Sequence, residues 1–162
     1  MKKLKLKLKG VFLMILIAVI LSGCTKLQQL VPGSTFSDHQ IIKAQLGNSK
    51  QLELEIVNTP QSITQGLSGR DELGADGMLF VFGQAKILQF WMKEMKFDLD
   101  LIWIKDMRVV EITRNVPAPG RGVPAAQLPT YKPSQPVDMV LEVGVGQAQE
   151  WGLEVGDEVL IL

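Results

Sequence analysis

The chain has very little of three residue types that often carry chemistry. Its 162 residues include one cysteine, one histidine and one tyrosine. With Cys24 alone, no intrachain disulfide and no cysteine-based zinc site can form. We expect the only histidine, His39, to be solvated in an N-terminal tether. Serine-histidine-aspartate and cysteine-histidine catalytic arrangements are therefore not expected.

The N-terminal segment has the pattern of a bacterial export signal. Five lysines precede an apolar run, residues 11–21, which is shorter than the roughly 20 residues that span a bilayer. Leu21-Ser22-Gly23-Cys24 then resembles the lipobox of bacterial lipoproteins, in which the cysteine receives a diacylglycerol. We expect a signal peptide over residues 1–23. The mature protein is then expected to be extracytoplasmic and attached to the cell membrane or outer membrane by lipid on Cys24. An uncleaved anchor helix is the alternative.

The remaining chain has no excess of positive charge. The signal contains five of the 17 Lys and Arg residues and none of the 17 Asp and Glu, which leaves 12 against 17 and a net charge of −5. A nucleic-acid partner needs a basic surface, so this class of partner is not expected.

Alternating and apolar runs predict one β-rich domain over residues 41–162, after a polar tether at 24–40. The expected strands are Ile41–Leu46, Gln51–Val57, Met78–Phe82, Lys86–Lys93, Phe97–Lys105, Arg108–Asn115, Val137–Val143 and Val155–Leu162. Short helices are expected at 61–67 and 146–152, and six of eight prolines mark a long loop within 117–136. The pattern predicts an α+β, mostly β domain: a small antiparallel rolled sheet or barrel with two short helices.

Several segments resemble the domain-of-unknown-function family number 192. They are Gln65-Gly66-Leu67-Ser68-Gly69-Arg70, Gly77-Met78-Leu79-Phe80-Val81-Phe82, Phe90-Trp91-Met92-Lys93, Leu99-Asp100, Leu141-Glu142-Val143-Gly144 and Gly156-Asp157. The resemblance implies a small β-rich, barrel-like domain, often exported, with no assigned reaction or ligand. The chain departs from the family at Ser68, where the family usually has methionine, and at Glu94-Met95, where it usually has Asn-Thr.

Charged residues at the start of a buried strand predict a polar site. Asp98 and Asp100 share one face of the strand at 97–105, and buried charges need partners. We expect them to meet Lys93 and Arg70 at the rim of the barrel, beside Trp91. An indole beside charges can grip a sugar ring or a peptide, so the sequence favours a binding or assembly module in the cell envelope that needs no cofactor.

Three other interpretations of this segment stay open. The charges could form a structural ion-pair network that fixes strand register. A lysine with a lowered pKa, Lys93, could act with Asp100 in an envelope hydrolase. Met92 and Met95 with Trp91 could bind copper(I), although methionine in a core is more often a filler of gaps.

Overall fold

The computed structural model describes residues 36–49, 51–120 and 122–162. The predicted signal peptide, Cys24 and most of the predicted tether lie outside the described residues. Within these three described ranges, no helix combines the length and apolarity needed to cross a membrane.

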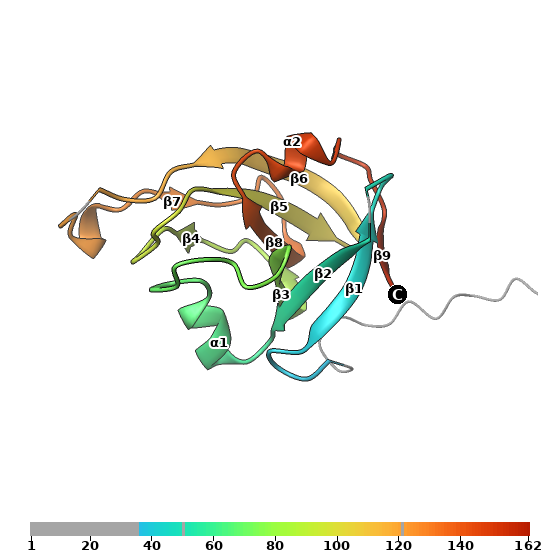
Figure 1. Cartoon of the computed structure of the whole chain (residues 1–162), viewed down its shortest axis with the longest axis horizontal. Coiled ribbons are helices and arrows are strands. Elements are labelled where there is room, and N and C mark those ends of the chain that lie inside the picture. Colours follow the sequence, from blue (N-terminus) through green and yellow to red (C-terminus); the bar gives the residue numbers. More distant parts are fainter. Residues whose placement is uncertain (1–35, 50, 121) are drawn as a thin grey trace, which may run out of the picture.

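Seven strands form one curled sheet in the order β6-β5-β8-β3-β2-β1-β9 (Figure 1). They are β1 (Ile41–Leu46), β2 (Leu52–Val57), β3 (Gly77–Lys86), β5 (Leu99–Lys105), β6 (Arg108–Val116), β8 (Val137–Gly144) and β9 (Val159–Ile161). A separate pair consists of β4 (Phe90–Trp91) and β7 (Thr130–Tyr131). The helices are α1 (Pro60–Gln65), the 3-10 turn η1 (Ala125–Gln127) and α2 (Gln147–Glu150). The expected α+β, mostly β class is confirmed.

The two ends of the sheet approach each other and give it the shape of a partial barrel. At the start of β6, Val109 N donates to Asp157 O and Gly156 N donates to Val109 O, each at 2.8 Å. Val159 N of β9 donates to Met107 O, also at 2.8 Å. Backbone hydrogen bonds thus link β6 to the segment that leads into β9, opposite edges in the strand order.

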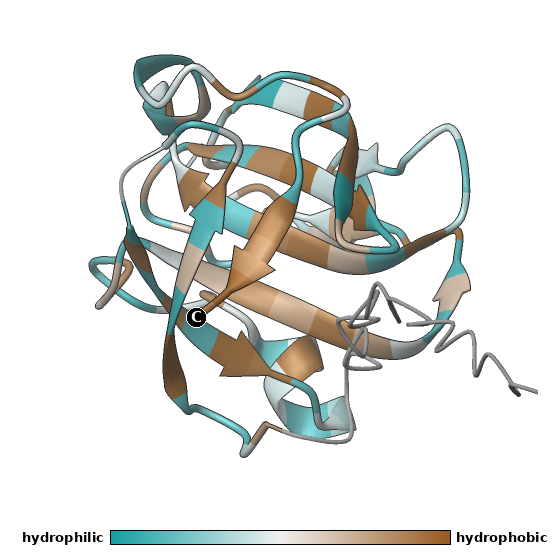
Figure 2. Ribbon diagram, turned by 90° about the vertical axis from the view of Figure 1, so that its right-hand side faces the viewer, coloured by the Kyte–Doolittle hydropathy of each residue, from teal (hydrophilic) through white to brown (hydrophobic). Residues whose placement is uncertain are grey.

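The two faces of the sheet bury two separate apolar clusters. Alternate side chains of the central strands, such as Leu54, Leu79 and Leu141, fill the interior of the curl. The opposite face carries Phe80, Val140 and other residues of a second cluster. Figure 2 shows the resulting hydrophobic stretches along the central strands. As expected for a strand buried on two sides, residues 99–104 of β5 are all buried.

A helical crossover explains the only parallel pairing among the described strands. β2 and β3 run parallel, because α1 lies between them in the chain and returns it to the same end of the sheet. Thr59 begins α1 as its N-cap in a capping box with Ser62, and Pro60 follows in the first turn. The sequence signals Thr59-Pro60 therefore place the helix correctly.

The predicted strand over Lys86–Lys93 is wrong. β3 itself continues to Lys86, and only Phe90–Trp91 of the remaining residues is extended in a strand. Glu94 follows with φ of +57°, a left-handed conformation that turns the chain. The last strand is also shorter than the predicted Val155–Leu162. Residues 156–158 form a turn and the contacts with the start of β6, and β9 begins only at Val159.

Candidate functional site

A pocket of about 280 Å³ lies on the second face of the sheet, between α1 and the segment that contains β4. Its walls come from the end of α1 and the following loop, from β3, from residues 88–91, and from β8. The lining residues are Ile63, Thr64, Gln65, Gly66, Leu67, Ser68, Phe80, Phe82, Leu88, Gln89, Phe90, Trp91, Met95 and Glu142. The second apolar cluster therefore surrounds a hollow that is open to one side.

Glu142 is the one acid in the pocket wall. It lies on β8 between its register partners, Met78 of β3 and Leu101 of β5, and only 6% of it is exposed. Within the part of the chain that the structure describes, no side chain or backbone group forms a hydrogen bond or ion pair with its carboxyl group. Burial raises the pKa of Glu142 to about 8. The pocket thus contains a buried carboxyl group without a partner.

Aromatic rings form a large part of the wall. Phe90 packs edge-to-face on Phe80, with ring centroids 5.1 Å apart, and on Trp103 at 5.5 Å. Trp91 is 47% exposed at the rim, and Lys93 Nζ lies 5.8 Å from the centroid of its ring. The predicted proximity of Trp91 and Lys93 is confirmed, and this exposed indole borders a real pocket.

Three of the four hydroxyl and amide side chains of the lining donate hydrogen bonds within the protein, and the fourth is that of Gln89. Thr64 Oγ1 donates to the carbonyl of Pro60 at 2.7 Å, and Gln65 Nε2 donates to the carbonyl of Ser68 at 2.7 Å. Ser68 Oγ donates to the carbonyl of Lys93 at 2.8 Å. These bonds fix the loop after α1 against the segment after β4, and they leave few donors for a ligand.

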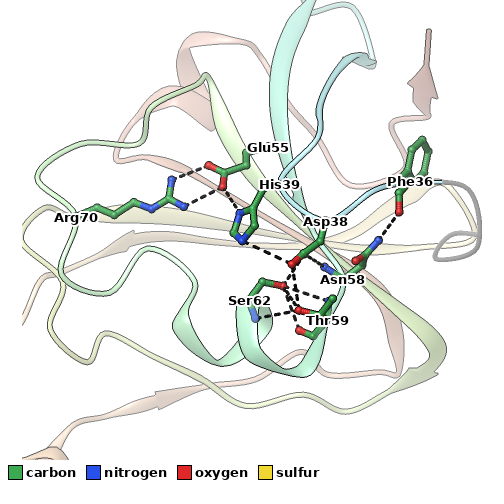
Figure 3. A network of polar contacts seen from close by, with 8 residues as sticks. All are labelled: Phe36, Asp38, His39, Glu55, Asn58, Thr59, Ser62 and Arg70. Atoms are coloured by element: carbon green, nitrogen blue, oxygen red, sulfur yellow. Dashed lines mark hydrogen bonds and ion pairs between the residues drawn. The ribbon is translucent and has the colours of Figure 1, made fainter.

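The structure pairs Arg70 with Glu55, which sequence analysis did not select. Arg70 binds both carboxylate oxygens of Glu55, at 2.6 and 2.9 Å, and His39 Nδ1 lies 2.7 Å from Oε1 (Figure 3). The hydrogen bond from Arg70, joined by that from His39 and opposed by burial, holds the pKa of Glu55 below its usual value. The side chain of His39 is 55% exposed, as expected of a solvated histidine. The residue does not lie in a tether, however, because it contacts β2 and its backbone N donates to Ile56 O.

Asp38 connects the same N-terminal stretch to α1. Its carboxylate accepts hydrogen bonds from Ser62 Oγ at 2.7 Å, from Thr59 Oγ1 at 3.1 Å and from the backbone N of Asn58 at 3.1 Å (Figure 3). Burial alone would raise the pKa of Asp38, but these bonds together lower it. Asp38 thus helps to hold in place the helix whose end forms one wall of the pocket.

The predicted cluster of Arg70, Lys93, Asp98 and Asp100 does not form. Asp100 is fully buried and accepts hydrogen bonds from the backbone N of Asn115 at 2.9 Å, Gly146 at 3.0 Å and Ala148 at 3.3 Å. It joins β5 to the end of β6 and to the start of α2, where three N–H groups replace the expected cations as partners.

The other two members of the cluster also have separate partners. Asp98 is exposed and accepts a hydrogen bond from the backbone N of Ala118 at 2.7 Å. Lys93 lies beside Trp91, with its Nζ 3.7 Å from Glu94 Oε1. Among the described residues, no ion pair joins Lys93 to Asp98 or Asp100. The hydrolase hypothesis required Lys93 and Asp100 to act together, and this arrangement does not support it.

Sequence analysis missed Glu142 as a site residue, although a signal was present. It is the one acid among apolar residues at 139–143, within the predicted strand Val137–Val143. The parity of β8 places it with Val140, on the face opposite Leu141 and Val143. That this face borders a pocket depends on α1 and β4, whose positions strand patterns do not predict.

The site is suited to binding more than to acid–base catalysis. Glu142 is the only ionisable residue of the pocket wall, so a mechanism that needs both an acid and a base would lack one of them. Met95 is part of the wall, while Met92 is 2% exposed in the apolar cluster. No group of three or more His, Cys, Asp or Glu that could hold a metal occurs among residues 36–49, 51–120 and 122–162.

Comparison with known proteins relates the chain to one family and to two solved structures. Residues 41–161 match the profile of DUF192, described as "Uncharacterized ACR". A Sinorhizobium meliloti protein described as a "putative transcription regulator" is 26% identical, with a TM-score of 0.66, and the match covers 78% of this chain and 97% of that one. A Novosphingobium aromaticivorans protein of unknown function is 29% identical, with a TM-score of 0.64 and coverage of 80% and 91%. No curated protein matches significantly.

Proposed function

The chain belongs to the DUF192 family, which is described only as uncharacterized, and we propose that this member is an envelope binding module. Its pocket takes one side chain or small group of a peptide ligand. The observation that carries the proposal is the pocket itself: about 280 Å³, with an exposed indole at the rim and an unpartnered carboxyl group in the wall. A concave apolar site with a few polar groups is the usual form of a ligand site.

The lining favours a peptide group over a sugar. A sugar ring presents many hydroxyl groups, and a site for it needs several free donors and acceptors. Here the side chains of Thr64, Gln65 and Ser68 donate to backbone carbonyls of the protein. The volume lies just below the range of about 300–1,000 Å³ for ligand pockets, which suits one extended side chain.

The location of the module is proposed from the N-terminal sequence. The lysine-rich start, the apolar run and Leu21-Ser22-Gly23-Cys24 support export and lipid attachment at Cys24. The residues between Cys24 and the packed stretch that begins at Phe36 would then hold the domain close to a membrane, within reach of envelope peptides.

The binding proposal is tested by observing the indole of Trp91 directly. In the whole lipoprotein in detergent micelles, the ¹H–¹⁵N signal of the Trp91 indole is assigned by its loss in Trp91→Phe. Fragments of the cell wall, peptides and sugars separately, are then titrated. We expect peptides to shift this signal and sugars to leave it unchanged.

Two variants make that test specific. Trp151→Phe removes an indole outside the pocket lining and should leave the Trp91 response intact. Trp91→Ala should weaken peptide binding in calorimetry while the circular dichroism spectrum stays that of the wild type. A Trp91 signal that no envelope fragment shifts would contradict the proposed binding site.

The anchor has its own test. Cells grown with labelled palmitate should label the wild-type protein and not Cys24→Ala, and the variant should leave the membrane fraction. Label on Cys24→Ala, or its full retention in the membrane, would disprove attachment through this cysteine.

A further inference from the structure

The chemical character of the pocket wall selects the charge of its occupant. Glu142 is its only ionisable residue, and the wall contains no lysine, arginine or histidine. An anionic ligand would meet a carboxyl group and no compensating cation. A cationic ligand would instead supply the partner that Glu142 lacks among the described residues.

The rings of the wall favour the same charge. The faces of aromatic rings attract cations, and two ammonium groups already lie beside lining rings. Lys86 Nζ is 5.4 Å from the centroid of Phe82, and Lys93 Nζ is 5.8 Å from that of Trp91. Neither lysine belongs to the pocket lining, so the place beside Glu142 is left for a ligand.

We propose that the pocket binds a primary ammonium group on a short alkyl chain, as at the end of a lysine side chain, and that Glu142 is its counter-ion. The inference rests on the proposed binding function and names the chemical class of the ligand. The ammonium N–H groups donate to the Glu142 carboxylate, and the alkyl chain packs against Phe80, Phe90 and Trp91. A pocket of about 280 Å³ has room for such a chain.

Binding of this kind displaces a proton. The pKa of free Glu142 is about 8, so at pH 7 roughly nine molecules in ten are protonated, and a cation binds the ionised form. Each ammonium bound at pH 7 therefore releases about 0.9 proton, and affinity should rise about tenfold between pH 7 and pH 9. An alkylamine remains charged over this range, since amines of the lysine type have a pKa near about 10.4.

The other charged groups on the neighbouring elements do not alter this reasoning. Glu55 of β2 lies two strands away from Glu142, with Met78 of β3 between them, and its charge is neutralised by Arg70. The charged end of β3 is Lys86, which is exposed, and α1 contains no charged residue. Two further acids stand apart: Asp100 on β5 binds backbone N–H groups, and Asp138 on β8 accepts from Asp106 N. Burial is the cause of the raised pKa of Glu142, with no contribution from another charge.

The test uses two probes of equal length, butylammonium and 1-butanol, titrated into the whole lipoprotein in detergent micelles, with micelles alone as the blank. Calorimetry at pH 7 in two buffers of different ionisation enthalpy counts the protons released. We expect butylammonium to bind at least tenfold more tightly than butanol, with release of about 0.9 proton. Glu142→Gln should weaken butylammonium at least tenfold and abolish the proton release.

The matched control is Glu94→Gln, which makes the same substitution of a carboxyl by an amide near the rim, at a residue outside the lining. It should leave butylammonium affinity within twofold. Equal binding of the two probes, unchanged binding in Glu142→Gln, or no binding of butylammonium would each overturn the ammonium inference. In these cases a peptide-dependent shift of the Trp91 indole would still support the binding module. Loss of both responses would overturn both proposals.

Discussion

Asp100 and Glu142 are buried acids on adjacent strands, but they differ in their partners. Asp100 accepts hydrogen bonds from three backbone N–H groups that belong to other parts of the chain. Glu142 accepts none from the described residues and lines a pocket. A buried acid with all its partners inside the fold contributes to stability, whereas one that costs stability is a candidate for function. The two acids should therefore respond to substitution with opposite signs.

The largest expected effect is the stabilisation of Glu142→Gln at alkaline pH. A raised pKa means that the folded state binds the proton more tightly, so the contribution is favourable below about pH 4.5 and is lost as the pH rises through 8. At about 1.4 kcal/mol per unit of pKa shift, the variant should gain on the order of 4 kcal/mol over the wild type at pH 9 and almost nothing at pH 4.5. Urea unfolding at both pH values measures this, and a variant that is less stable than the wild type at pH 9 would be contrary to the account.

Asp100→Ala should change stability in the opposite direction. It removes the acceptor of three backbone N–H groups and should cost about 3 kcal/mol at pH 7. Asp100→Asn keeps one carbonyl acceptor and should cost about half as much, so the pair separates lost hydrogen bonds from lost volume. Urea midpoints give both numbers. A loss of less than about 1 kcal/mol in Asp100→Ala would mean that the three bonds are not structural.

Arg70→Met removes the side-chain partner of a third acid, Glu55. The pKa of Glu55 is lowered, chiefly by its hydrogen bond from Arg70, so this pair stabilises the fold above about pH 4.5 and its contribution is lost as the pH falls. Arg70 is 32% exposed in its side chain, and solvent screening reduces the expected cost to about 1–2 kcal/mol at pH 7. Urea unfolding should show a difference in stability between wild type and Arg70→Met at pH 7 and a much smaller difference at pH 3. An undiminished difference at pH 3 would exclude this ion pair as the cause.

Glu94→Asn is the smallest expected change and concerns neither buried acid. Glu94 has φ of +57°, a conformation that asparagine adopts more readily than glutamate. The variant should be about 0.5 kcal/mol more stable, because the left-handed turn after β4 is less strained. Thermal unfolding measures the shift, with Glu94→Gln as the control that changes charge and not turn preference. Equal midpoints for Asn and Gln would remove the backbone explanation.

Strand patterns predicted more of the fold than of the site. Alternation in Leu52, Leu54 and Ile56 and the apolar run of Leu101–Ile104 predicted β2 and β5 correctly, because side-chain period follows directly from backbone geometry. The segment with Trp91 was predicted as one strand over Lys86–Lys93, but only Phe90–Trp91 is extended there, where it pairs with β7 of the long loop.

Partners of charged groups could not be predicted in the same way. Arg70 was assigned to Asp98 and Asp100, but it pairs with Glu55 of β2, whose position beside it depends on the crossover through α1. Glu142 was passed over because one acid in a buried strand gains meaning only when the elements around it are known. Contacts between distant segments decide which buried acid is paired and which is open to a ligand.

Titration of the Glu142 carboxyl group shows whether the pocket wall contains a buried acid without a partner. Carbon-13 labelling of glutamate side chains, with the Glu142 signal identified by its loss in Glu142→Gln, allows its carboxyl resonance to be followed from pH 4 to pH 10. We expect a midpoint at about pH 8 in the free protein and a lower midpoint when butylammonium is added. A midpoint below about pH 5 in the free protein would show a carboxyl group that is solvated or paired, and would contradict this expectation.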